Sequence, residues 1–413
     1  MKFSIYPFHI NKKVFIPSSK SYLQRWIALA SVTPYCSIIK NPNFCDDVNA
    51  ALNCARNLGA KVIANNNEIQ IQGIEKNFSN KEVKLNVGES GLSARMFACI
   101  ASVLFEKVSI TGEGSLLKRD MSSLINALQK TNCKVLSNNN HLPIEIYRTG
   151  GFEKIDIDIS DTSQVVTGLL YTSCLVNKDV SIYVSNPVSI PYIQLSIEVA
   201  KKFGLKIITE NYHQFIISAN QTFQPVNDTA EGDWSNAAFF AVAAALSGKV
   251  ELHHLNPDSS QGDKIIVDIL KKAGAKVEWD GNVCIIQKEH LHPFEIDLKN
   301  HPDLFPPLVV LALGINGKSY LKSVSRLINK ESNRADVLIK EFSKLGATIF
   351  IENDVMIIDG KGYLKGGNIY SYQDHRIAMA AAVAGCIAND KIIIENAEAV
   401  NKSYPDFFNH LLH

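Results

Sequence analysis

The sequence lacks a net charge and long apolar runs, and each absence removes a class of function. Over 413 residues, 42 Lys and Arg balance 41 Asp and Glu, so no overall field attracts nucleic acid or a membrane surface. No stretch approaches the ~18 apolar residues of a membrane span, and the opening MKFSIYPFHINKK has no apolar core typical of a secretion signal. We therefore expect a cytoplasmic protein with neither a nucleic-acid nor a membrane partner, and any anion site must be a local concentration of charge.

Metal and nucleotide motifs are also missing. The eight cysteines are scattered without a Cys-x-x-Cys pair, which favours buried free thiols in a reducing compartment. The histidine-rich patches at 253–254 and 290–301 have no matching cysteine or carboxylate pattern, so we expect no metal. No P-loop, Gly-x-Gly-x-x-Gly or His-Glu-x-x-His pattern occurs, so a nucleotide, nicotinamide or zinc mechanism has no support and we expect no cofactor.

What the chain does contain is an internal repeat. Five similar segments read as a helix end followed by a strand. They are RNLGAKV from Arg56, QKTNCKV from Gln129, KKFGLKI from Lys201, KKAGAKV from Lys271 and SKLGATI from Ser343, spaced by 73, 72, 70 and 72 residues. A polar turn and a second strand follow each, which predicts hairpins.

Polar helix starts recur with the same period. They are SSKS from Ser18, GESG from Gly88, SDTSQ from Ser160, GDWSN from Gly232, HPDLF from His301 and QDHR from Gln373, spaced by 70, 72, 72, 69 and 72 residues. Each precedes an apolar helix, then a strand and an amphipathic helix. The two series together predict six βαβαββ units.

The repeat predicts an α/β protein of two domains with three units each. Only the sixth unit, which ends in PDFFNHLL, has no hairpin after it. We expect the N-terminal strands to close it, so that residues 12–227 form one domain and residues 1–11 with 228–413 form the other. Right-handed connections place the helix starts of a sheet on one side, where each adds about half a positive charge. These starts should converge on the gap between domains and bind a multiply charged anion, with phosphate the best candidate.

Charged and hydroxyl side chains gather at the helix starts. The first helices of the units contribute Lys20, Ser21, Arg25, Glu89, Arg95, Thr162, Ser163, Gln164, Asp233, Asp303, Asp374, His375 and Arg376, and the loops before the second helices contribute Lys118, Arg119, Ser189, Tyr192, Lys330, Glu331, Arg334 and Lys402. Any one of them alone reads as a cap or a surface ion pair. We expect Asp233 and Asp374 to be caps or orienting residues, and Arg95, inside an apolar helix, to brace its loop.

Nine motifs spanning the chain resemble the 5-enolpyruvylshikimate-3-phosphate synthase family. They are IPSSKSYLQR (16–25), VGESGLSARMF (87–97), TSQVVTGLL (162–170), VSIPYIQLSIEVAKKFG (188–204), EGDWSNAAFF (231–240), PDLFP (302–306), NKESNRADVL (329–338), DHRIAMA (374–380) and NKSYPDFF (401–408). The KES-x-R and DHR-x-AMA elements are the most specific. The resemblance implies a two-domain inside-out barrel of six βαβαββ repeats with its active site in the interdomain cleft.

The resemblance also implies a reaction of the shikimate pathway, which leads to chorismate and the aromatic amino acids. The family transfers the enolpyruvyl group of phosphoenolpyruvate to the 5-hydroxyl of shikimate 3-phosphate and releases phosphate without metal or cofactor. Its inhibitor glyphosate occupies the phosphoenolpyruvate subsite. We expect the two substrates as the only partners and a monomeric protein.

Site residues are carried over by position in the motifs. Phosphoenolpyruvate is assigned to Lys20, Gly91, Arg119, Gln164, Arg334, Arg376 and Lys402. Shikimate 3-phosphate is assigned to Ser21, Arg25, Thr162, Ser163, Gln164, Ser189, Tyr192, Asp303 and Lys330. Asp303 is the expected general base at the 5-hydroxyl, and Glu331 the expected proton donor to C3, with Lys20 as its competitor. His375 completes the expected catalytic set.

Several positions depart from the family pattern. Ser18 stands for the usual Gly of Gly-Ser-Lys-Ser, Glu89 for Asn, Leu92 for Thr, Arg326 for Asn and Asn333 for Asp. None of these removes a charged catalytic position. They bear instead on how the phosphate is bound and on how sensitive the protein is to the inhibitor.

Two alternatives were weighed. The first is the related transferase that acts on UDP-N-acetylglucosamine, which typically has Cys or Asp in the loop that here reads GEGSLLKRD (112–120). This loop has no Cys, and its Asp120 follows Arg119, outside that catalytic position. The second is a catalytically dead paralogue, which would be expected to have lost Asp303, Glu331 or a lysine.

Overall fold

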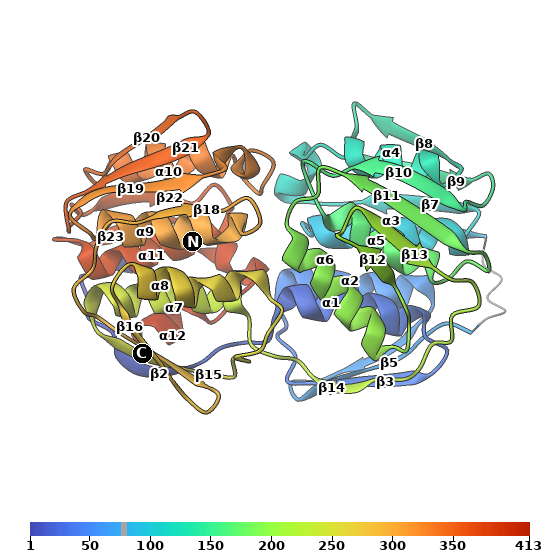
Figure 1. Ribbon diagram of the computed structural model, residues 1–413, viewed down its shortest axis with the longest axis horizontal. Coiled ribbons are helices and arrows are strands. Elements are labelled where there is room, and N and C mark those ends of the chain that lie inside the picture. Colours follow the sequence, from blue (N-terminus) through green and yellow to red (C-terminus); the bar gives the residue numbers. More distant parts are fainter. Residues whose placement is uncertain (76–80) are drawn as a thin grey trace. The chain divides into compact units, whose positions relative to one another are not determined.

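The computed structural model describes residues 1–75 and 81–413 and divides into two compact units (Figure 1). The inserted unit is Ser18–Ala230, and the split unit combines Met1–Pro17 with Glu231–His413. The chain therefore crosses between units a few residues later than the expected positions near 12 and 227. The reason is local pairing: β2 (Asn11–Phe15) and β14 (Asn227–Thr229) both hydrogen-bond into the unit that precedes the crossing.

Three sheets build the inserted unit. Their strand orders are β14-β3-β5-β4, β6-β7-β9-β8 and β10-β11-β13-β12. The strands are β3 (Cys36–Lys40), β4 (Lys61–Ala64), β5 (Glu68–Gln72), β6 (Glu82–Asn86), β7 (Lys107–Thr111), β8 (Cys133–Asn138), β9 (His141–Arg148), β10 (Lys154–Asp158), β11 (Val180–Ser185), β12 (Ile208–Glu210) and β13 (Gln214–Ile217). The helices are α1 (Lys20–Val32), α2 (Asp46–Leu58), α3 (Gly91–Leu104), η1 (Gly114–Lys118), α4 (Ser122–Lys130), α5 (Gln164–Ser173) and α6 (Ile190–Lys202).

The split unit has the same plan. Its strand orders are β16-β17-β15-β2, β18-β19-β21-β20 and β1-β23-β22. The strands are β1 (Lys2–Ile5), β15 (Lys249–His253), β16 (Lys276–Asp280), β17 (Val283–Gln287), β18 (Glu295–Asp297), β19 (Gly317–Lys322), β20 (Thr348–Glu352), β21 (Val355–Gly360), β22 (Gly367–Tyr370) and β23 (Ile392–Glu395). The helices are α7 (Trp234–Ser247), η2 (Gly262–Ile265), α8 (Ile266–Lys272), η3 (Pro302–Leu304), α9 (Phe305–Leu313), η4 (Val324–Leu327), α10 (Arg334–Ser343), α11 (His375–Ala384), η5 (Gly385–Ile387), η6 (Ala397–Lys402) and α12 (Phe407–Leu412).

The predicted repeat is confirmed. In four repeats the strand before the first helix pairs in parallel with the strand after it, as β6 does with β7 and β18 with β19. In three of these repeats an antiparallel hairpin follows; in the sixth repeat β1 takes its place beside β23. The hairpin between β8 and β9 turns on Asn139 and Asn140, both at positive φ, a conformation that Asn tolerates well.

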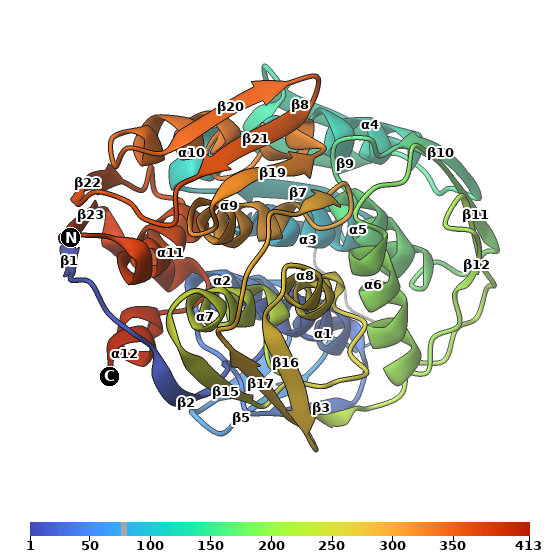
Figure 2. The same ribbon diagram turned by 60° about the vertical axis from the view of Figure 1, so that its left-hand side comes forward.

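The first and fourth repeats exchange their opening strands between the units. β2 precedes α1 of the inserted unit but pairs in parallel with β15 of the split unit, with Val14 opposite Leu252 (Figure 2). β14 precedes α7 of the split unit but pairs in parallel with β3 of the inserted unit. The N-terminus therefore closes the sixth unit with β1 alone, through its pairing with β23. We expected both N-terminal strands to pair within the sixth unit, and this was wrong for β2. β2 instead pairs with β15 and takes the place of the parallel neighbour that the fourth repeat has given to the inserted unit.

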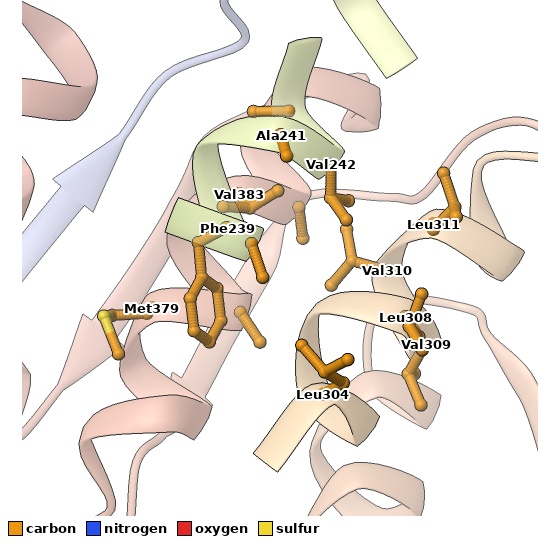
Figure 3. Close-up of a cluster of buried hydrophobic side chains, with 14 of the residues drawn as sticks. Phe239, Ala241, Val242, Leu304, Leu308, Val309, Val310, Leu311, Met379 and Val383 are labelled. Atoms are coloured by element: carbon orange, nitrogen blue, oxygen red, sulfur yellow. The ribbon is translucent and has the colours of Figure 1, made fainter. Parts of the chain in front are cut away.

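The first helices of the repeats form the core of each unit. Every residue of α7, α9 and α11 is buried, as their apolar sequences require. Figure 3 shows Phe239 and Val242 of α7 packed among Leu308 and Val310 of α9 and Met379 of α11. This apolar packing leaves the polar N-terminal ends of the helices as the places where charge collects.

Candidate active site: charged clusters at helix N-termini

Lys20 opens α1 and is held by a carboxylate. Ser19 caps the helix by accepting a hydrogen bond from the Tyr22 amide. The Lys20 Nζ lies 2.8 Å from Oδ2 of Asp47, in the first turn of α2, with 12% and 8% of the two side chains exposed. A charge-assisted contact of this length fixes the ammonium group in place. Asp47 was not among the expected site residues. It lies on the next helix, α2, and nothing in the sequence indicates that it pairs with Lys20.

Arg25, one turn further along α1, is almost fully buried at 1% exposure. Its Nε donates to Ser196 Oγ at 2.8 Å and its Nη1 to the Ser21 carbonyl at 2.8 Å. Its guanidinium also lies 5.8 Å from the ring centre of Tyr192, whose carbonyl accepts from Nη2 at 3.2 Å. Burial lowers the pKa of Arg25, against the opposing influence of Tyr171 and Tyr192. Arg25 thus orders Ser21 and Tyr192, two further residues expected at the shikimate 3-phosphate site.

The second cluster of the inserted unit surrounds Gly91, the first residue of α3. We call Gly91, Arg95, Arg119 and Gln164 the Gly91 cluster. A Cβ on Gly91 would lie 2.8 Å from Nη1 of Arg119 and 3.1 Å from Nη1 of Arg95, so the absence of a side chain at 91 lets two guanidinium groups approach this helix start without being displaced. The helix dipole and both cations favour an anion there.

Arg95 braces the cluster as expected. Its Nη1 donates to the Gly91 carbonyl and to Gln164 Oε1, each at 3.1 Å, and its Nη2 donates to the Asp120 carbonyl at 3.2 Å. Burial and the charge of Arg119 lower its pKa to about 9, which still leaves it charged at neutral pH. Arg95 therefore ties α3, α5 and the loop that carries Arg119 together.

The remaining expected residues of the inserted unit lie at the starts of α5 and α6. Thr162 Oγ1 accepts from the Gln164 amide at 3.3 Å, and Ser163 is 5% exposed. Ser189 occupies the N-cap position of α6 with a positive φ of 51° and makes no side-chain capping hydrogen bond, while its carbonyl accepts from the Tyr192 amide at 3.0 Å. All three hydroxyls sit at the helix starts where the repeat placed them.

The split unit carries a denser cluster centred on Arg334. We call Asp303, Glu331, Arg334, Asp374 and Arg376 the Arg334 cluster. Arg334 is 1% exposed and donates to three carboxylates: Nη1 to Asp303 Oδ1 at 2.8 Å, Nη2 to Glu331 Oε2 at 2.6 Å and Nε to Asp374 Oδ2 at 2.8 Å. Burial opposes the charge of Arg334, but the three carboxylates outweigh it and raise its pKa. One buried guanidinium thus positions both residues expected to move protons.

Asp303 contacts a second cation. Arg376 donates from Nη2 to Asp303 Oδ2 at 3.0 Å. Burial alone would raise the pKa of Asp303, but Arg376, Lys330 and Arg334 outweigh it and hold that pKa far below its usual range. Lys330 differs, because burial lowers its pKa to about 8 against the attraction of Asp303. A firmly ionised carboxylate, Asp303, therefore lies in the field of an ammonium group, Lys330, whose pKa is brought closer to neutral pH.

The start of α11 contributes three adjacent residues. Asp374 caps the helix by accepting from the Arg376 amide at 3.0 Å, which confirms its expected capping role. Asp233 likewise caps α7 through the Asn236 amide at 3.0 Å. His375 is buried at 1% exposure, with Nδ1 3.9 Å from Asp374 Oδ1, and Lys402, at the end of η6, is 5% exposed.

Sequence reasoning missed a buried carboxylate beside this cluster. Asp263, in η2, is 2% exposed and accepts from Ser235 Oγ in the first turn of α7. Its Oδ1 lies 3.9 Å from Nδ1 of His301. Burial and the negative charge of Asp303 raise the pKa of Asp263 to about 7, against the influence of Arg376. The QGD segment after a strand was its only sequence signal, and it reads as an ordinary loop.

The described residues hold neither a metal-binding cluster nor a membrane-spanning helix. In residues 1–75 and 81–413, no group of three or more His, Cys, Asp or Glu side chains is arranged to hold a metal ion. Within the same residues, no helix combines the length and apolar character needed to cross a bilayer.

Known proteins share this fold and these motifs. Residues 7–411 match the family described as EPSP synthase (3-phosphoshikimate 1-carboxyvinyltransferase). The 3-phosphoshikimate 1-carboxyvinyltransferase of Clostridium botulinum (strain Alaska E43 / Type E3) is 35% identical over 98% of this chain and 95% of its own. That of Methanocorpusculum labreanum is 36% identical over 98% of this chain and 97% of its own.

Solved structures agree on the fold. EPSP synthase from Acinetobacter baumannii superposes with a TM-score of 0.81 at 25% identity, covering 99% of this chain and 97% of its own. The enolpyruvyl transferase NikO from Streptomyces tendae has a TM-score of 0.78 at 13% identity, covering 99% and 96%, and at that identity it shows the fold alone.

These six α/β repeats form the fold of the solved enolpyruvyl transferases. The chain belongs to the EPSP synthase family. It is a transferase with 3-phosphoshikimate 1-carboxyvinyltransferase activity, as its motifs predicted. The role of each site residue stays a prediction.

Proposed function

We propose that the Gly91 cluster and Lys20 of the inserted unit act with the Arg334 cluster and Lys402 of the split unit as one active site. That site transfers the enolpyruvyl group of phosphoenolpyruvate to the 5-hydroxyl of shikimate 3-phosphate. The observation that carries the proposal is the closeness of the Arg119 and Arg95 guanidinium groups to Gly91 at the start of α3. The chain that holds this arrangement matches the family from residue 7 to 411. Neither unit alone holds both the phosphate-binding cations and the proton-moving carboxylates.

The chemistry requires two proton movements and one departure. The 5-hydroxyl oxygen bonds to C2 of phosphoenolpyruvate as its proton leaves, and C3 gains a proton to give a tetrahedral intermediate. Loss of a C3 proton and cleavage of the bond from C2 to the phosphate oxygen then restore the double bond and release phosphate. Fixed cations stabilise the phosphate and carboxylate charges through both steps, and holding both substrates together removes the entropic cost of their encounter.

Phosphoenolpyruvate is assigned to the cations of both units. The Gly91 amide at the start of α3, with Arg119 and Lys20, suits its phosphate. Arg376 and Lys402 suit its carboxylate. Arg334 is buried and already donates to three carboxylates, so we assign it a positioning role in the ligand-free state and a substrate contact only after its partners rearrange.

Shikimate 3-phosphate is assigned to the hydroxyl-rich helix starts. Ser163 and Ser189 suit the 3-phosphate, with Ser21 and Tyr192 ordered beside them by Arg25. Asp303 and Lys330 then face the ring hydroxyls. This arrangement places the proton acceptor for the 5-hydroxyl on the split unit.

Asp303 becomes a base only when its partners change. Two guanidinium groups hold it in the ligand-free protein, and a carboxylate so paired has little affinity for a proton. If the carboxylate of phosphoenolpyruvate takes Arg376, Asp303 loses one of these partners and gains proton affinity. Burial lowers the pKa of Lys330 to about 8, so the neutral amine, once its own proton has gone to solvent, can accept the proton in turn. Glu331 remains the assigned donor to C3.

The decisive assay measures phosphate release from phosphoenolpyruvate. The proposal requires release that depends on shikimate 3-phosphate and gives no product with UDP-N-acetylglucosamine. The carbonyl of Asp120 accepts from Arg95, and both of its carboxylate oxygens accept from Ser122. This use of the carboxylate disfavours a catalytic role for Asp120 in the alternative reaction. Release with UDP-N-acetylglucosamine but not with shikimate 3-phosphate would overturn the assignment.

A site drawn from two units requires them to close over the substrates. The two crossings, at 17–18 and 230–231, are the natural hinges. Small-angle scattering at saturating shikimate 3-phosphate should show a smaller radius of gyration than the free protein, and an unchanged radius argues against closure. The same measurement tests whether the protein is a monomer, as expected.

The cysteines have free thiols, which supports the expected cytoplasmic location.

A further inference from the structure

The loop that carries Arg119 is fastened to the start of α3 by a side chain with no assigned role. Glu89, two residues before Gly91, accepts hydrogen bonds at Oε2 from the Ser115 amide at 3.1 Å and from Ser115 Oγ at 2.6 Å. Ser115 is the second residue of η1, whose own preceding residue, Glu113, provides no side-chain cap. Glu89 therefore caps η1 from outside that helix. It accepts from the Ser115 amide, one of the backbone donors that a helix start leaves without a partner inside the helix.

The fit between Glu89 and the loop depends on Gly114. This residue has a φ of +53°, and a Cβ there would lie 2.2 Å from Glu89 Oε1. A side chain at 114 would therefore collide with the carboxylate as well as strain the backbone. The adjacent backbone adds a further link, because the Glu113 amide donates to the Gly88 carbonyl at 2.8 Å.

Arg95 fastens the other end of the same loop. Its Nη2 donates to the Asp120 carbonyl at 3.2 Å, while its Nη1 donates to the Gly91 carbonyl at 3.1 Å. Arg119 lies between these two attachments, with Nη1 2.8 Å from the Cβ position of Gly91. The loop is thus fixed on both sides of Arg119 to residues that flank Gly91.

A carboxylate close to an anion site would normally repel the ligand. Here two donors from Ser115 bind the Glu89 charge, which reduces the cost of placing it near Gly91. We infer that Glu89 is a positioning residue for phosphoenolpyruvate: through Ser115 it holds the Arg119 loop so that the guanidinium stays at Gly91. The inference rests on the proposed function, in which Arg119 binds phosphoenolpyruvate.

The test compares steady-state constants of four variants with the wild-type enzyme. Glu89→Ala, which removes both hydrogen bonds, should raise KM for phosphoenolpyruvate about tenfold. Ser115→Ala removes only the hydroxyl donor and should raise it less. The double variant should be no worse than Glu89→Ala alone, because Ser115 Oγ has already lost its Glu89 acceptor there. KM for shikimate 3-phosphate should change less than twofold. Glu89→Gln should recover most of the loss, since an amide oxygen still accepts from Ser115.

Glu113→Ala is the matched control. Its side chain is exposed on the same loop and accepts from Asn86 Nδ2 at 2.8 Å, so we expect KM for phosphoenolpyruvate within twofold of wild type. Folding is checked by the thermal midpoint; if Glu89→Ala does not fold, Ser115→Ala and Glu89→Gln carry the test. Unchanged KM in folded Glu89→Ala and Ser115→Ala, or additive losses in the double variant, would overturn the inference.

Arg119→Ala separates this inference from the proposed function. If Arg119→Ala keeps the wild-type KM for phosphoenolpyruvate, the assignment of the site fails first. If Arg119→Ala raises that KM and Glu89→Ala does not, only the positioning role of Glu89 fails.

Discussion

Nη1 of Arg334 lies 2.8 Å from Oδ1 of Asp303 while Nη2 of the same guanidinium lies 2.6 Å from Oε2 of Glu331. The residues assigned to take and to give a proton are therefore fixed by one buried cation. Their separation and orientation depend on a residue that is itself 1% exposed. Catalysis and stability should respond together when it is changed.

Arg334→Met should both unfold more easily and lose activity. The substitution leaves three carboxylates without their common cation, and breaking a buried ion pair typically costs about 3–5 kcal/mol. Urea titration measures the loss, with Lys318→Ala as an exposed control expected within about 0.5 kcal/mol of wild type. A folded Arg334→Met protein of unchanged stability would contradict the central place given to this guanidinium.

Lys20→Met should lower kcat/KM for phosphoenolpyruvate about 30- to 1000-fold, because it removes about 2–4 kcal/mol of transition-state stabilisation in a desolvated site. It also removes the ion pair with Asp47, at a cost in stability of about 1–2 kcal/mol. Adding Asp47→Asn should restore the stability without restoring activity. Recovery of both in the double variant would mean that Lys20 acts only through Asp47.

Asp263→Asn should change how stability depends on pH. The raised pKa of about 7 means that the folded protein keeps a proton that the unfolded chain loses near pH 4, so wild-type stability contributed by this group falls as pH rises from 4 to 7. Asparagine removes that loss. The variant should gain on the order of 2 kcal/mol relative to wild type between pH 5 and pH 8.

Chemical denaturation at both pH values measures the gain from Asp263→Asn, with Asp336→Asn as an exposed control. A constant difference across the window would contradict the raised pKa. Because Asp303 and Arg376 influence Asp263, the pH dependence of kcat should shift in the same variant.

Leu92→Thr should lower the ratio of the glyphosate inhibition constant to KM for phosphoenolpyruvate about ten- to thirtyfold, a difference of about 1.4–2 kcal/mol. Leu92 is 8% exposed and packs in the core next to Gly91. Ser90 already caps α3 by accepting from the Ser93 amide, so a threonine at 92 is not needed as a cap. The remaining reason is the bulk of leucine, which narrows the subsite for a longer ligand.

Leu136→Thr, at an exposed position on β8, is the control for the glyphosate measurement. A ratio that does not fall in Leu92→Thr would show that neighbouring side chains absorb the change in size.

The sequence predicted the features that depend on local order. Equal spacing of the helix starts predicted six repeats. Asp233 and Asp374 were predicted as caps because each acts at its own helix start, and Arg95 was predicted as a brace because a buried cation in an apolar helix must bind nearby polar groups. It did not predict the partners of Lys20 and Glu89. Asp47 and Ser115 lie 27 and 26 residues away, and no periodic pattern encodes which side chains meet across two loops. β2 was misplaced for a similar reason, since its pairing with β15 joins residues more than two hundred positions apart.

The exchanged strands also set the order in which the protein can be built. All residues of the inserted unit, β14 included, have been synthesised once the chain reaches Ala230, so this unit can fold while the ribosome is still translating. The split unit must wait, because Lys2 of β1 can pair with Glu395 only after residue 395 has been synthesised. Closing so long a loop costs entropy that grows with the logarithm of its length, and nonlocal strand pairing slows folding. β1 is thus made before the strands of the inserted unit but is paired after them.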